Sequence, residues 1–162
     1  MKKIFAIILL FFCWGSGQAQ LFRIVRAYAF FSVSVPGMQR VDDRGNPVNP
    51  DPIIDRVIYI ECRFNGRPKI DSVLYNGVLY AATVADKEEN VLSIGTRQDN
   101  GKAIVLPRSK GNHIWRIDVS QLEGKPLLHE QLKKIVLKGK LNSNKFAFTL
   151  ISETQLSTPD RP

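Results

Sequence analysis

Apolar and polar residues alternate along most of the chain, which is the pattern of half-buried β-strands. The clearest case is SVLYNGVLYAATV, residues 72–84, where two Val-Leu-Tyr triplets flank Asn76-Gly77. Both central residues of a type I′ turn need positive φ, and the Asn-Gly pair meets this requirement. The pattern therefore predicts a hairpin with a two-residue loop, in which Tyr75 pairs with Val78.

Similar strand patterns recur on both sides of this hairpin and are separated by turns rich in Gly, Asn and Asp. They cover residues 22–35, 55–64, 90–96, 102–107, 113–119, 134–141 and 145–153. With the two hairpin arms they make about nine short strands, which indicates an all-β fold. The long first strand and the proline-rich connection at 36–52 favour a single-domain β-sandwich of immunoglobulin-like character over residues 20–153.

One helix is predicted, and it is short. Gly124 argues against a continuous helix after the strand at 113–119, whereas proline is tolerated in a first helical turn. We therefore expect a helix over residues 126–133. Residues 154–162 are polar and contain two prolines, so they are expected to form a flexible tail.

Residues 1–19 have the pattern of a secretory signal peptide. Two lysines precede an apolar run from Ile4 to Trp14, and small residues lead to a cleavage site after Ala19. The run is about half of the ~20 apolar residues that span a bilayer, and no later segment is apolar enough to do so. We therefore expect an exported, soluble protein, either periplasmic or extracellular.

The charge is unevenly distributed. The formal net charge is +8, and removal of Lys2 and Lys3 with the signal peptide leaves +6. Residues 97–145 carry eleven Lys and Arg against four Asp and Glu. This surplus favours an anionic partner, such as lipid headgroups, an anionic glycan or an acidic protein surface, whereas export disfavours nucleic acid. A solvated basic face that only aids solubility is the alternative.

Four basic residues are candidates for an interaction surface. The strand at 134–141 places Lys138 and Lys140 on one side, with Lys134 in the same phase, and Arg116 points outward from its own strand. Lysines on a strand also protect a sheet edge from pairing with another molecule. The pattern alone leaves both interpretations open.

Three other side chains are candidates for either the core or a site. Tyr75 and Tyr80 share one hairpin side and, if exposed, offer a platform for a sugar ring or an anchor for a protein. We favour burial for both tyrosines. Cys62 shares a strand face with Ile58 and Ile60, so it is predicted to be a core residue rather than a reactive thiol.

No motif for catalysis, cofactor binding or a metal site is found. His113 and His129 have no ligand or nucleophile at a diagnostic spacing. The loop at 36–52 gathers oxygen-bearing side chains that suit calcium, but it lacks the spacing of a known calcium loop. These side chains are Asp42, Asp43, Asn46, Asn49 and Asp51.

The sequence therefore favours a non-catalytic interaction module of the bacterial cell envelope that docks to another envelope protein. A glycan-binding domain is the first alternative, and it depends on exposed aromatic side chains. A small secreted hydrolase with an unrecognised site is the second.

Overall fold

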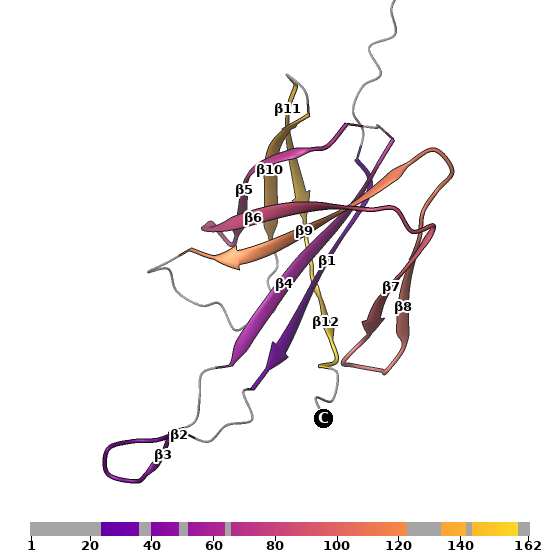
Figure 1. Cartoon of the computed structure of the whole chain (residues 1–162). Coiled ribbons are helices and arrows are strands. Elements are labelled where there is room, and N and C mark those ends of the chain that lie inside the picture. The colour runs from indigo at the N-terminus through magenta and orange to yellow at the C-terminus, as the bar shows by residue number, and fades with distance from the viewer. Residues whose placement is uncertain are drawn as a thin grey trace, which may run out of the picture.

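The computed structural model describes residues 24–35, 40–48, 52–63, 66–122, 134–141 and 144–158. In these residues the chain is all-β, and eight strands form one curled sheet in the order β11-β10-β5-β6-β9-β4-β1-β12 (Figure 1). The strands of this sheet are β1 Ile24–Ser34, β4 Ile53–Cys62, β5 Lys69–Tyr75, β6 Val78–Lys87, β9 His113–Gln121, β10 Ile135–Leu141, β11 Asn144–Leu150 and β12 Thr154–Leu156. The other four form two hairpins, β2 Arg40–Val41 with β3 Pro47–Val48 and β7 Val91–Thr96 with β8 Ala103–Pro107.

The predicted hairpin is confirmed. Asn76 and Gly77 both have positive φ, 47° and 88°, and Tyr75 pairs with Val78 across the turn. The Asn-Gly pair thus sets the register of β5 and β6, and with it the side of the sheet that each arm residue faces.

The curled sheet has an apolar core on its inner face. The buried side chains there are Ala29, Ile58, Ile60, Cys62, Val73, Tyr75, Tyr80, Trp115, Ile117, Val119, Ile135, Leu137 and Leu150. A second, smaller cluster lies on the outer face, where Leu92 and Leu106 of the β7–β8 hairpin pack on Phe30, Tyr59 and Ile114. The interior strand β4 is therefore buried on both faces over its second half, which explains the apolar run from Val57 to Ile60.

The all-β class is confirmed, but an immunoglobulin-like sandwich is not. Eight strands belong to one sheet, and β7–β8 is a small second layer on part of its outer face. The helix predicted at 126–133 and the signal peptide at 1–19 lie outside the described residues. In the described part no helix has the length and apolarity needed to cross a lipid bilayer.

The prediction of a flexible tail from residue 154 is wrong for its first residues. Thr154 to Leu156 form β12, which pairs in parallel with Phe30 to Ser32 of β1. The backbone N–H of Ser157 donates to the Thr96 carbonyl at 2.8 Å. Tertiary contacts hold this polar segment, because Leu156 packs on the outer cluster. Residues 159–162 lie outside the described part.

Candidate interaction surfaces

The two tyrosines predicted from the hairpin lie in the core. Tyr75 is 0% exposed and Tyr80 is 4% exposed, and their rings make an edge-to-face contact with centroids 5.2 Å apart. Trp115 is also buried and belongs to the same inner-face cluster. None of the three can therefore stack on a sugar ring or anchor a partner at the surface, and the glycan-binding alternative loses the aromatic platform that it needs.

A buried ion pair, which the sequence analysis missed, lies against Tyr75. Nε of Arg56 is 3.5 Å from Oε2 of Glu153, and the two side chains are 3% and 0% exposed. The guanidinium of Arg56 also lies over the Tyr75 ring, 5.1 Å from its centroid. Burial raises the pKa of Tyr75, and the charge of Glu153 raises it further. One feature of the sequence indicates that Arg56 is buried: it lies on the same side of β4 as Ile58 and Ile60, at alternate positions.

Arg116, predicted to face outward, lines a groove of about 490 Å³ on the outer face of the sheet. Its polar lining side chains include Asp55, Tyr59, Thr83, Asp118 and Ser120. Nε and Nη2 of Arg116 each lie 2.7 Å from Oδ1 of Asp118. Burial lowers the pKa of Arg116, but the hydrogen bond to Asp118 and the electrostatic effects of Tyr59, Asp118 and Asp55 together leave this pKa above its ordinary value. The groove can therefore bind polar groups, with Arg116 held as a fixed cation.

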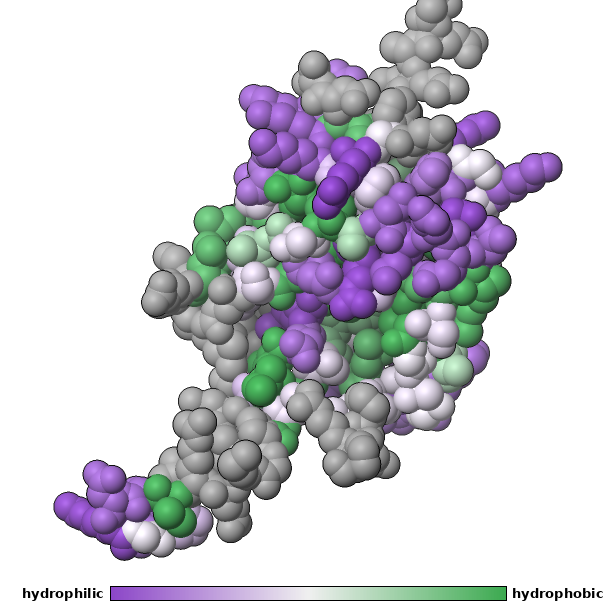
Figure 2. All heavy atoms as spheres, viewed as in Figure 1, coloured by the Kyte–Doolittle hydropathy of each residue, from purple (hydrophilic) through white to green (hydrophobic). Residues whose placement is uncertain are grey.

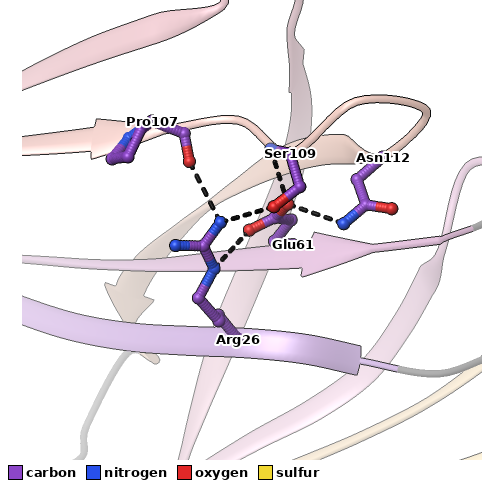
Figure 3. Close-up of polar contacts among 5 residues, drawn as sticks. All are labelled: Arg26, Glu61, Pro107, Ser109 and Asn112. Carbon is purple, nitrogen blue, oxygen red and sulfur yellow. Dashed lines mark hydrogen bonds and ion pairs between the residues drawn. The ribbon is translucent and has the colours of Figure 1, made fainter.

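Glu61 joins β8 and the β8–β9 turn to the sheet (Figure 3). Its carboxylate accepts hydrogen bonds from Nε of Arg26 at 2.6 Å, Nδ2 of Asn112 at 2.6 Å and the backbone N–H of Ser109 at 2.9 Å. Nη2 of Arg26 also donates to the Pro107 carbonyl at 3.2 Å. Burial alone would raise the pKa of Glu61, but these hydrogen bonds outweigh it and lower the pKa to about 2. Glu61 is thus an anchor that is ionised at neutral pH.

The remaining candidates for chemistry have structural roles or weak contacts. Cys62 is a core residue, as predicted, and burial raises the pKa of its thiol to about 12, so it is unreactive at neutral pH. Nδ1 of His113 is 4.0 Å from Oδ2 of Asp86. In the loop that was considered as a calcium site, the Asp42 carboxylate instead accepts hydrogen bonds from the backbone N–H groups of Arg44 and Asn46, at 2.9 and 2.8 Å. The described residues contain no group of three or more His, Cys, Asp or Glu that could hold a metal.

The lysines of β10 lie on an interior strand. β10 pairs with β5 on one side and with β11 on the other, so the edge of the sheet is β11. Lys138 is exposed and Lys140 is half-buried on the outer face, and Lys134 is exposed just before β10 begins. Edge protection therefore does not explain the lysines of β10.

Two strand edges face one another across an open seam, which sequence reasoning did not anticipate. Residues 24–29 of β1 pair with β4 on one side, and no described strand pairs with their other side. β11 pairs only with β10 among the described strands. Between these edges lies a groove of about 300 Å³, lined by residues 27–30 and 148–152 together with Thr154.

Comparison with known proteins gave no match to any family model, any curated protein or any solved structure. The candidate surfaces therefore rest on the geometry of this chain alone.

Proposed function

We propose that this chain is an exported, non-catalytic module that docks to another protein of the cell envelope by accepting one of its strands. The observation that carries the proposal is the open seam between β1 and β11. An unpaired strand edge presents a row of N–H and C=O groups, and an extended peptide binds such an edge by adding a strand to the sheet.

The seam has the features of a docking edge rather than of a protected one. Natural edge strands are blunted by charges, prolines or bulges. At this seam Arg26 and the irregularity beside it lie at the start of β1, and Lys145 lies at the start of β11. Along the rest of the seam the side chains of Val25, Tyr28 and Ile151 are exposed and apolar. Ala27 and Ala29 line β1 with small side chains, which leaves room for the alternate residues of an incoming strand.

The partner is therefore an extended polypeptide segment with apolar residues at alternate positions. Main-chain hydrogen bonds to the seam supply affinity, and the apolar residues that enter beside Ala29 and Phe148 supply specificity. The polar groove around Arg116 lies on the outer face, away from this edge, and is not needed for strand addition.

Site-specific photo-crosslinking in cells tests the proposal. A crosslinking residue at Ile151, which is 81% exposed at the seam, is compared with one at Val91, which is 61% exposed on the β7–β8 hairpin. We expect Ile151 to give one discrete adduct with an envelope protein and Val91 to give none. With the purified partner, Ile151→Lys should weaken binding by about tenfold or more, because it places a charge at the edge. Val91→Lys should leave binding unchanged.

Two outcomes would contradict the proposal. Adducts of equal yield from Ile151 and Val91 would show that the partner does not bind specifically at the seam. An adduct only with a second copy of this chain, accompanied by a dimer in light scattering, would assign the seam to self-association.

A further inference from the structure

The sheet register brings three lysines from three different strands into one row. Lys140 of β10 pairs directly with Lys69 of β5 and with Lys145 of β11. Residues that are directly opposite on neighbouring strands have Cβ atoms about 5 Å apart, and like charges at this distance repel one another. Lys138 follows two residues along the same face of β10, so the row is part of a wider basic face.

This basic face has almost no compensating acid among the described residues. β5, β10 and β11, with Lys134 before β10, contain five lysines, and Asp71 is their single acidic residue. None of these five lysines, nor Asp71, belongs to an ion pair in the described part. Elsewhere, basic residues such as Arg26, Arg97 and Arg116 are each paired with a carboxylate. The positive charge of the lysine row is thus not balanced by any ion pair within the described residues.

Gly139 determines which residues of β5 and β10 lie opposite one another in the lysine row. The pairing of β5 with β10 shifts between Lys138 and Gly139, so that Asp71 is left out of register. A Cβ at Gly139 would overlap the backbone carbonyl oxygen of Lys69 and would lie 2.9 Å from the Phe146 ring. Close approach of β5 and β10 at this glycine therefore holds Lys69 beside Lys140.

We propose that this face binds the anionic headgroups of a lipid bilayer. Outward positions on the three strands carry no aromatic ring, and their basic residues are all lysine. Protein interfaces are enriched in arginine and aromatic residues and are depleted in lysine, so a protein partner fits this face less well. A plane of negative headgroups requires only point charges, which lysine supplies.

Apolar residues border the lysines on the same face. Val136 pairs with Leu74, which in turn pairs with Leu79, and Leu79 is exposed. In the view of Figure 2, hydrophilic side chains gather over the ends of β10 and β11. A bilayer surface offers anionic headgroups to the lysines and an interfacial zone to the apolar row.

Sedimentation with vesicles tests this assignment. The full mature chain is mixed with vesicles of phosphatidylcholine alone or of equal parts phosphatidylcholine and phosphatidylglycerol. We expect binding only to the anionic vesicles, and weaker binding as salt rises. Each lysine near an anionic surface contributes about 1 kcal/mol, so the triple variant Lys69→Gln, Lys140→Gln, Lys145→Gln should lose roughly a hundredfold in affinity.

A second triple variant controls for net charge. It removes three lysines that lie away from the row, as Lys87→Gln, Lys102→Gln and Lys110→Gln, and should retain most of the binding. Circular dichroism and thermal unfolding of both variants establish that they are folded. Equal losses of vesicle affinity in the two triple variants would overturn the assignment. Binding to neutral vesicles as strong as binding to anionic ones would also overturn it. Tighter binding to a soluble anionic glycan with the same lysine dependence would assign the row to a glycan instead.

This inference is independent of the strand-docking proposal. Ile151→Lys acts at the seam and should not reduce vesicle binding, and the lysine triple should not reduce crosslinking from position 151. Failure of one proposal is therefore distinguishable from failure of the other.

Discussion

At the residue scale, Glu61 shows how a buried carboxylate can stabilise this fold. Arg26, Asn112 and Ser109 all donate to it, and together they join the β8–β9 turn to β1 and β4. The lowered pKa of Glu61 means that the folded protein prefers the ionised form more strongly than the unfolded chain does.

The difference between the folded and the ordinary pKa of Glu61 predicts that the protein becomes less stable at acid pH. The folded pKa of about 2 lies below the ordinary value of 4.5, so the stabilisation is fully present above about pH 4.5 and is lost as pH falls toward about 2. The shift corresponds to roughly 3 kcal/mol at neutral pH. Urea unfolding should therefore show Glu61→Gln to be less stable by about 2–3 kcal/mol near pH 7, with the difference shrinking at acid pH. Exposed Glu88 is the matched control, and an equal loss in Glu88→Gln would contradict this role of Glu61.

Single residues differ in how far the sequence predicts them. Burial of Tyr75, Tyr80 and Cys62 follows from strand periodicity and is confirmed. The partners of Glu61 and Arg56 could not be predicted, because alternation gives the side of a strand but not the neighbour across it.

At the element scale, local signals were sufficient for most strands. All nine expected strands are present, because alternation and turn residues are local properties of the chain. β12 was missed because a three-residue polar strand has no local signal. Its pairing with β1 and the contacts of Leu156 stabilise it instead.

Gly139 gives a prediction at this scale. A methyl group there would overlap the Lys69 carbonyl oxygen, which belongs to the backbone and cannot simply rotate away. Gly139→Ala should therefore separate β5 from β10 and lower the free energy of unfolding by about 1–3 kcal/mol. Urea unfolding measures this loss, with Lys138→Ala at the neighbouring exposed position as the control. Equal stability of Gly139→Ala and the wild type would show that the two strands are not so close.

At the scale of the whole molecule, the order of the strands in the sheet could not be predicted from the sequence. β1 pairs with β4 and β12, and β5 pairs with β10, although all these partners except β4 are distant in the chain. Periodicity does not choose among such pairings, which is why two facing sheets were expected where one curled sheet forms. For the same reason the seam and the lysine row, which depend on strand order, could not be predicted.

The Arg56–Glu153 ion pair joins β4 to the segment just before β12, and variants of the pair test how much it stabilises the fold. Removal of one member leaves the other charged in the core, so Arg56→Met and Glu153→Gln should each cost about 3–5 kcal/mol. The double variant should cost clearly less than the sum of the two, because it leaves no lone buried charge. Urea unfolding of the four proteins measures the coupling. Strict additivity would mean that the two side chains stabilise the fold independently.

Parallel pairing of β12 with β1 also has a consequence for biosynthesis. A growing polypeptide makes β1 first and β12 last among the strands described, so the sheet edge beside Phe30 and the charge of Arg56 stay uncovered until Glu153 and Leu156 have emerged. Completion of this part of the sheet is thus expected only late in translation, once β12 has been made.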